Sequence, residues 1–247
     1  MSSSRRTSIL KRLQSEMPRG KPLDSHGLAS VGVYPELAYR YVRSGWLERL
    51  GRGVLMFASD QLQRDRCLAF LAGRVAGFHV GGKSALALHG LRHNVPAREV
   101  LSLWGEKSTR IPQWFSSRFP SRYTARSLFA ESLPRGFGLQ TLPEDPDGPP
   151  VSVPERALLE MLSEVGVSQE LDEARLIVET ARSLRADVLA ELLRACRQQK
   201  ALRLCVSWAE ELALPWASVA RKAAEPLIGS NRWVSKRKNG KSLILKP

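Results

Sequence analysis

The chain has 247 residues, 43% hydrophobic and 25% charged, which suits one large or two small globular domains and excludes a wholly disordered chain. Its 38 Lys and Arg exceed its 24 Asp and Glu, so the net charge of +14 indicates a polyanionic partner, either nucleic acid or an acidic membrane. No apolar run approaches the roughly 18 residues of a membrane-spanning helix, and no secretion signal follows the first residues. Three cysteines without CxxC spacing disfavour a disulfide framework and a Cys-rich zinc site, so we expect a cytoplasmic protein without membrane contact.

The positive charge lies at the two ends of the chain. Residues 1–60 hold 10 basic and 5 acidic side chains, and residues 221–247 hold 8 and 1. The long middle, residues 61–220, holds 20 and 18 and is nearly neutral. A surface charged only for solubility would spread its excess evenly, so both basic ends are expected to be contact surfaces.

Three short helices are predicted in the first 45 residues. Apolar residues on one face predict a helix over about residues 4–17, which Pro18 ends. Asp24 or Ser25 can cap a second helix that runs to about Ser30. The third helix begins at Pro35, whose missing N–H costs nothing at the first helical position, and ends at about Ser44 before Gly45.

A hairpin follows the third helix. Residues 46–50 and 54–58 are expected to be strands, and Gly51-Arg52-Gly53 is the turn between them. Helix, helix, turn, helix and hairpin, in that order, indicate a winged helix-turn-helix DNA-binding domain over residues 1–60.

The third helix has two unlike faces. Leu37, Ala38, Tyr41 and Val42 share one face and are expected to pack inward. The opposite face carries the side chains expected to reach base edges and phosphates in a DNA major groove: Glu36, Tyr39, Arg40 and Arg43. Arg can pair bidentately with guanine and Glu can accept from cytosine. Taken alone, the two arginines would favour a solvated helix face over a DNA contact.

Other cations extend the predicted DNA-binding surface. Arg49 and Arg52 lie on the hairpin, where a wing would meet the DNA backbone or minor groove. Arg5, Arg6 and Lys11 on the first helix are expected to add phosphate contacts. The combination of basic helix, turn and basic wing favours DNA contact over a merely solvated face.

Residues 61–228 predict an α+β domain with strands early and a helical C-terminal half. The expected helices and strands are a helix over 61–75, an apolar stretch at 78–80, a helix over 84–91, a strand at 100–104, a short helical piece at 111–115, strands at 122–129 and 138–142, and helices over 153–164, 168–182, 185–197, 199–213 and 216–228.

Residues 229–247 predict a basic hairpin around the turn Asn239-Gly240, the strongest two-residue hairpin signal. Its cations form a second basic patch: Arg232, Lys236, Arg237, Lys238 and Lys241. The patch could be a second polyanion-binding element or a frayed basic tail without specific contacts.

Two motifs invite an enzymatic interpretation. Residues 77–84, GFHVGGKS, match the phosphate-binding pattern GxxxxGK[ST], in which backbone amides and a lysine hold phosphates. However, the pattern requires a buried strand before the first glycine, and an amphipathic helix is predicted there instead. A DNA-dependent P-loop ATPase using Lys83 stays open as an alternative, as do a nuclease and an RNA-binding protein.

His89 and His93 have the spacing of a helical metal pair, but Gly90 between them is expected to end the helix. No other arrangement of acids, cysteines or serines has a recognisable catalytic signature. We therefore expect no enzymatic activity, no catalytic residues, no metal and no cofactor.

Three segments resemble a known family. Residues 44–54 (SGWLERLGRGV), the stretch from His79-Val80 to residues 84–91 (SALALHGL), and residues 153–160 (VPERALLE) are similar to segments of AbiEi-type antitoxins. Each segment is short and apolar, and their conserved order over about two-thirds of the chain carries the resemblance. The basic C-terminal hairpin matches no motif of that family.

The resemblance implies a transcriptional regulator of a bacterial type IV toxin–antitoxin, or abortive-infection, operon. Its N-terminal domain would bind double-stranded DNA at inverted repeats in its own promoter and repress transcription. Its second domain would neutralise a nucleotidyltransferase-like toxin without forming a stable complex. No Asp-x-Asp follows Gly229-Ser230, so the chain lacks the metal ligands of such a toxin.

Overall fold

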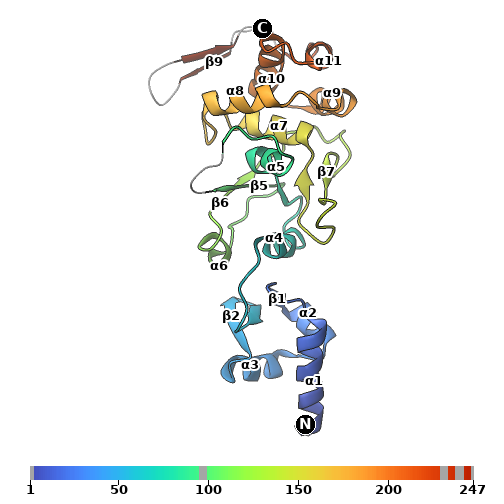
Figure 1. The fold of residues 1–247 in the computed structure, drawn as a ribbon, viewed down its shortest axis with the longest axis vertical. Coiled ribbons are helices and arrows are strands. Elements are labelled where there is room, and N and C mark those ends of the chain that lie inside the picture. The colour runs from blue at the N-terminus through green and yellow to red at the C-terminus, as the bar shows by residue number, and fades with distance from the viewer. Residues whose placement is uncertain (1–2, 95–98, 229–232, 237–241, 246–247) are drawn as a thin grey trace. The chain divides into compact units, whose positions relative to one another are not determined.

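The computed structural model describes residues 3–94, 99–228, 233–236 and 242–245, with side chains for residues 8–94 and 99–228 (Figure 1). Its contacts divide the chain into two compact units. Unit 1 comprises residues 1–74 with the segments 110–119 and 147–149, and unit 2 comprises the remainder.

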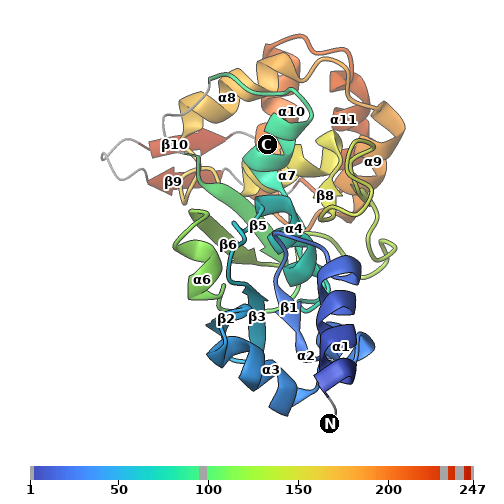
Figure 2. The ribbon, with the colours of Figure 1, turned by 60° about the horizontal axis from the view of Figure 1, so that its bottom comes forward.

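Unit 1 contains a winged helix-turn-helix. In chain order its elements are α1 (Ser3–Glu16), β1 (Leu23–Asp24), α2 (Ser25–Ser30), α3 (Pro35–Arg43), β2 (Leu47–Gly51) and β3 (Val54–Phe57). The three strands form an antiparallel sheet in the order β1-β3-β2, and Figure 2 shows them side by side above α3. The predicted helices and the hairpin are confirmed; β1 was not predicted because two residues are too few to show an alternating pattern.

Local chemistry sets the ends of these elements. Asp24 caps α2, since its side chain accepts a hydrogen bond from the Gly27 N–H at 2.8 Å. Pro35 occupies the first turn of α3, as expected. The hairpin turn is shorter than the predicted Gly51-Arg52-Gly53: Gly51 pairs with Val54, so the turn consists of Arg52 and Gly53, and Gly53 takes a φ of +68° that favours glycine.

The core of unit 1 lies beneath α3. Leu13 of α1, Leu28 of α2, Tyr41 of α3 and Leu47 of β2 are buried in one apolar cluster. The other inner-face residues of α3 pack partly buried against it: Leu37, Ala38 and Val42. Burial of the predicted inner face therefore leaves the opposite face of α3 to solvent.

Two further helices complete unit 1. They are α4 (Arg64–Ala72) and α6 (Gln113–Ser116), joined by an edge-to-face contact of Phe70 and Trp114 with ring centroids 6.3 Å apart. Helix α4 is shorter than predicted because the Gln63 N–H donates to the Gly20 carbonyl at 2.9 Å, which keeps the preceding backbone extended, and because Gly73 ends the helix.

Unit 2 has a five-stranded mixed sheet with helices packed against it. The strands are β4 (His79–Val80), β5 (Leu101–Gly105), β6 (Ser121–Ala125), β7 (Leu139–Gln140) and β8 (Val151–Ser152), in the order β6-β5-β4-β8-β7. The helices are α5 (Gly82–Leu88), α7 (Pro154–Ser163), α8 (Leu171–Thr180), α9 (Ala186–Ala195), α10 (Gln199–Glu211) and α11 (Ala217–Ala224). The early strands and helical second half agree with the predicted α+β class.

Tertiary contacts shortened or created some of these elements. The strand expected over 122–129 ends at Ala125, where its ladder with β5 ends. Strand β8 lies between the strand predicted at 138–142 and the helix predicted from residue 153, where no strand was predicted, and it pairs with β4 and β7 on either side. Cys196 and Cys205 lie buried in unit 2, and burial raises the pKa of the Cys196 thiol to about 11.

Strands β9 (Trp233–Lys236) and β10 (Ser242–Leu245) pair antiparallel, as the C-terminal hairpin prediction requires, while its predicted turn lies outside the described residues. Among the described helices none is long and apolar enough to span a membrane.

Replacing Leu13 with Ala is expected to lower the free energy of unfolding by about 2–5 kcal/mol, because the side chain is fully buried and its loss leaves a cavity beneath α3. Urea denaturation of the full chain measures the change. The neighbouring substitution Gln14→Ala, at an exposed position of the same helix, should change stability by less than about 0.5 kcal/mol. Equal effects of the two substitutions would contradict the described core.

Candidate nucleic-acid interface

The outward face of α3 forms a shallow surface groove. Its lining contains all four side chains that the sequence assigned to the major groove: Glu36, Tyr39, Arg40 and Arg43. Pro35 and Ser44 complete its lining. All four predicted side chains are exposed, and Tyr39 has 58% of its surface accessible. The structure thus brings together the predicted set on one open helix face.

The arginines of this face have no ion-pair partner among the residues whose side chains the structure describes. Among the described residues, none forms an ion pair or hydrogen bond with the guanidinium groups of Arg40 and Arg43. Many other arginines of the chain are paired, such as Arg19 with Asp60 and Arg74 with Asp24. A cation without a partner can meet a phosphate or a base edge without first breaking an internal ion pair.

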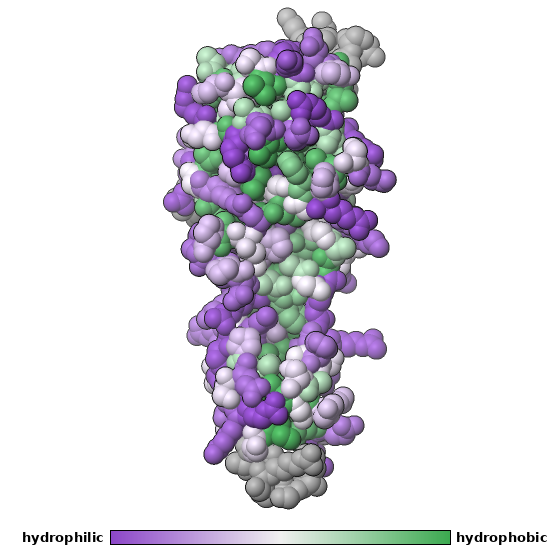
Figure 3. All heavy atoms as spheres, turned by 90° about the vertical axis from the view of Figure 1, so that its right-hand side faces the viewer, coloured by the Kyte–Doolittle hydropathy of each residue, from purple (hydrophilic) through white to green (hydrophobic). Residues whose placement is uncertain are grey.

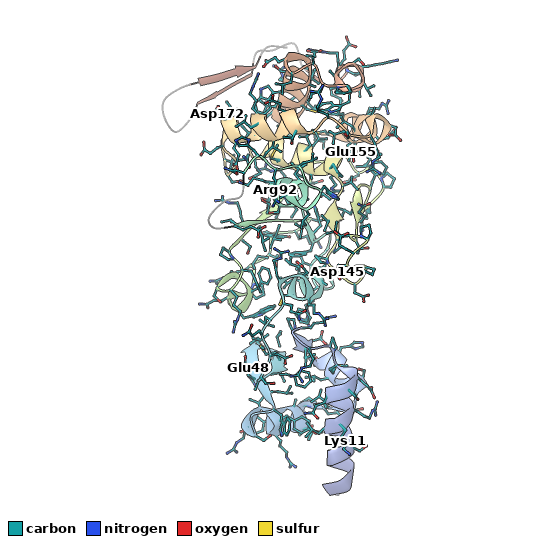
Figure 4. The ribbon with its side chains drawn as sticks, in the orientation of Figure 1. Lys11, Glu48, Arg92, Asp145, Glu155 and Asp172 are labelled. Carbon is teal, nitrogen blue, oxygen red and sulfur yellow. The ribbon has the colours of Figure 1, made fainter. Side chains whose placement is uncertain are left out.

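The wing carries two more such cations. Arg49 lies on β2 and Arg52 in the two-residue turn; both side chains are exposed, and no described residue forms an ion pair with either. Glu48, which Figure 4 labels on β2, is half-buried. The exposed positions of the hairpin therefore present positive charge.

The first helix is only partly described. Lys11 is exposed on α1 (Figure 4), and the adjacent Arg12 forms an ion pair with Glu16 at 3.1 Å. Arg5 and Arg6 belong to α1, but their side chains lie outside the described ones.

The second basic patch falls largely on residues that the structure does not describe. Arg232, Arg237, Lys238 and Lys241 lie outside them. Lys236 ends β9, and only its backbone is described.

Two exposed aromatic residues flank α3 and were not predicted as site residues. Tyr34 immediately precedes the helix and is 60% exposed, and Trp46 follows it at 44%. Sequence patterning assigned Trp46 to a strand, and nothing in the pattern marked Tyr34. Their exposure beside the cationic face marks them as candidate contact residues, because large aromatic side chains in solvent often lie on contact surfaces.

Figure 3 shows one face of the molecule, where hydrophilic side chains are interspersed with smaller hydrophobic areas.

The segment that matches the P-loop pattern has a different geometry in unit 2. Residues 79–80 of the motif form β4, and α5 begins at Gly82. The Gly82 N–H, which would face a phosphate in a P-loop, donates to Glu160 Oε2 at 2.9 Å. Lys83 pairs with Glu173 at 2.8 Å, and Ser84 Oγ accepts a hydrogen bond from the Ser102 N–H. An internal carboxylate therefore occupies the place of a bound phosphate.

Glu160 is the centre of a buried polar network. Only 1% of its surface is exposed, and its oxygens accept hydrogen bonds from Ser152 Oγ at 2.9 Å and Arg156 Nε at 2.8 Å. His79 Nε2 lies 3.0 Å from Glu160 Oε1, while His79 Nδ1 lies 2.6 Å from the Gly77 carbonyl. Each ring nitrogen of His79 thus lies within hydrogen-bonding distance of an acceptor oxygen.

The electrostatics of this network favour an ionised carboxylate. Burial by itself raises the pKa of Glu160, but the neighbouring His79 and Arg156 outweigh it and hold the pKa at about 2. Position 81, next to the Glu160 carboxylate, requires glycine, because a Cβ there would lie 2.3 Å from Glu160 Oε2. The network joins β4, α5, β8 and α7.

The proposed histidine pair does not form a shared helical face. Helix α5 ends at Leu88, and Gly90 takes a φ of +79° that directs the chain away. His89 Nε2 lies 2.9 Å from the Ser152 carbonyl oxygen, whereas His93 is exposed. Within the described residues no cluster of three potential metal ligands occurs.

Fold and site together place the chain in the class of winged helix-turn-helix proteins, with an open cationic face on α3 and an α+β unit after it. Two sequence profiles match this chain: one described as the N-terminal domain of AbiEi antitoxin transcriptional regulators over residues 6–97, and one described as transcriptional regulator, AbiEi antitoxin, type IV toxin–antitoxin system over residues 98–243. The chain therefore belongs to the AbiEi antitoxin family of transcriptional regulators of type IV toxin–antitoxin systems, which confirms the resemblance seen in the sequence.

A solved structure has a similar fold over most of the chain. It is the crystal structure of the RV2827C protein from Mycobacterium tuberculosis, with a TM-score of 0.58 and 15% sequence identity, covering 91% of this chain and 82% of that one. At this identity the likeness concerns the fold alone. No curated protein sequence matches the chain.

Replacing Glu160 with Gln is expected to lower the free energy of unfolding near neutral pH by about 3 kcal/mol. The pKa of Glu160 is lowered from 4.5 to about 2, so its stabilisation is present above pH 4.5 and is lost as the pH falls toward 2. Urea denaturation at several pH values should therefore show the difference between the wild type and Glu160→Gln shrinking below pH 4.5.

The matched control is Glu191→Gln, at an exposed carboxylate paired with Arg194. It should change stability by less than about 1 kcal/mol at every pH. A pH-independent difference between wild type and Glu160→Gln would contradict the ionised state assigned to Glu160.

Proposed function

We propose that this protein is a DNA-binding transcriptional autorepressor and the antitoxin of a type IV toxin–antitoxin pair, neutralising a nucleotidyltransferase-like toxin without a stable complex. Membership of the family supports the general role. The open face of α3, with two arginines that have no partner among the described residues, is the observation that carries the DNA-binding part.

In this proposal residues 1–60 bind the inverted repeats of the protein's own promoter. Arg40 and Arg43 read base edges or hold phosphates in the major groove, with Glu36 and Tyr39 beside them. Arg49 and Arg52 hold the DNA backbone from the wing, and the first helix adds phosphate contacts. Replacing a cation that contacts phosphate with a neutral residue would weaken binding to all DNA sequences to the same extent.

Residues 61–228 form the antitoxin part in this proposal, and residues 229–247 are a basic extension. A non-enzymatic role agrees with the use of the P-loop-like segment to hold an internal carboxylate. Growth rescue tests the antitoxin role: the nucleotidyltransferase-like toxin that this proposal requires in the same operon is expressed alone, with the wild-type chain, and with the chain carrying both Arg40→Ala and Arg43→Ala. Rescue by both forms of the chain is expected, and no rescue by the wild type would contradict the role.

Replacing Arg40 with Ala is expected to weaken binding to the promoter by about 1–3 kcal/mol and to relax specificity at one base pair, because a bidentate contact to a base is lost. Gel-shift titrations on the native promoter and on single-base variants measure both effects. Arg43→Ala should also weaken binding.

The control for Arg40 is Arg110→Ala, an exposed arginine of unit 1 that does not line the groove of α3. Its affinity for the promoter should stay close to that of the wild type. If Arg40→Ala binds every promoter variant as the wild type does, the assignment of α3 to the major groove is wrong.

Replacing Arg52 with Ala is expected to weaken promoter binding uniformly across sequences, because a wing contact to phosphate carries no base information. The slope of log affinity against log salt concentration should fall by about one. Fluorescence anisotropy between low and moderate salt measures this slope. An unchanged slope would remove Arg52 from the interface.

A further inference from the structure

Unit 2 contains a cavity of about 430 Å³ that the proposed function does not use. Residues of α5, β5, β6, α7 and α8 line it, and the volume lies in the range of roughly 300–1,000 Å³ that organic ligands occupy in proteins. A free inorganic anion would fill only a small part of it.

The interior offers both apolar and hydrogen-bonding surface. Trp104, Met161 and Ile177 contribute apolar lining, and the indole of Trp104 is a flat surface suited to an aromatic group. Ser84 and Thr124 contribute hydroxyl groups. Since Ser84 Oγ already accepts from the Ser102 N–H, its own hydrogen remains to be donated.

The carboxylates at the cavity are held by other groups of the chain. Glu160 is bound by Arg156 and His79, as described above. Glu173 pairs with Lys83 at 2.8 Å, and Glu164 pairs with Arg126 at 2.9 Å. Glu99 also interacts with another group of the chain. The negative charge of the lining is thus largely compensated from within.

Two arginines of the lining have no ion pair with any residue whose side chain the structure describes. Arg92 follows α5 (Figure 4) and Arg122 lies on β6; both are exposed, and no described residue forms an ion pair or hydrogen bond with either guanidinium. A guanidinium presents a planar fork of N–H donors that matches the oxygens of a phosphate. The positive charge that remains at the cavity therefore calls for an anionic ligand.

We propose that this cavity binds an organic phosphate of the nucleotide class, with its phosphate on Arg92 and Arg122 and its base in the apolar interior beside Trp104. This binding mode differs from that of a P-loop. The Gly82 N–H already donates a hydrogen bond to Glu160, and the Lys83 ammonium already donates one to Glu173. No reaction is part of the proposal: the site binds and holds its ligand.

Isothermal titration calorimetry of the full chain in magnesium-free buffer tests the proposal, with AMP, GMP, CMP and UMP as probes and ribose 5-phosphate and inorganic phosphate as comparisons. At least one nucleotide should bind saturably, about tenfold or more tightly than ribose 5-phosphate. Equal affinity for nucleotide and ribose 5-phosphate would overturn the base site. Absence of saturable nucleotide binding would overturn the whole proposal.

Substitutions locate the ligand. Arg92→Ala and Arg122→Ala should each weaken nucleotide binding about tenfold or more, as expected for the loss of a hydrogen bond to a charged group. Arg135→Ala, at an exposed arginine of unit 2 outside the cavity, should leave it unchanged. Ala87→Phe, which fills the cavity without changing charge, should abolish binding while circular dichroism stays that of the wild type.

The test is independent of DNA binding. Arg40→Ala and Arg43→Ala should keep full nucleotide affinity, because those residues belong to unit 1. If nucleotide affinity falls in these variants but not in Arg92→Ala and Arg122→Ala, the ligand binds the DNA-binding face and the cavity assignment is wrong. Failure of promoter binding in wild type would instead contradict the proposed function and leave the calorimetric result standing.

Discussion

The amphipathic character of α3 is the constraint on which the proposed role of this protein depends. Burial of Tyr41, with the packing of Leu37 and Val42 against Leu13 and the rest of the apolar cluster, fixes which side of the helix faces the core. Because side chains three and four positions apart share a face, the same burial turns the polar set outward. Burial of the apolar face of α3 therefore fixes the direction of the charged side chains on its opposite face, although it does not stabilise those charges.

Unit 2 depends on a different kind of constraint. A buried carboxylate without partners would cost several kcal/mol, so Glu160 is accompanied by donors from four elements of the unit. This network holds the start of α5 against α7 and β8 and replaces the anion that a glycine-rich loop would otherwise bind. The same letters in a sequence can therefore serve a phosphate in one protein and an internal carboxylate in another.

The distribution of paired and unpaired cations links the two units to function. Arginines that complete the fold, such as Arg156 and Arg185, bind buried carboxylates, whereas those of the α3 face and of the cavity mouth have no partner among the described residues. Net charge alone could not separate these two groups. Pairing by itself does not mark a site either, because exposed arginines without an ion pair among the described residues, such as Arg110 and Arg135, also lie outside both surfaces; the proposals therefore rest on the groove of α3 and on the cavity as well.

The sequence by itself determined the order of the first three helices of unit 1, a cap at Asp24 or Ser25, the start of α3 at Pro35, a hairpin turning at residues 51–53 and the outward set on α3. These features follow from residues within about four positions of one another, so local periodicity and turn chemistry reveal them. Only the tertiary structure decided the two-residue strands β1 and β8, the partners of Glu160 and the cavity of unit 2. Their contacts join residues such as Gly82 and Glu160 or Lys83 and Glu173, which lie 78 and 90 positions apart, and no local pattern records which distant groups the fold brings together.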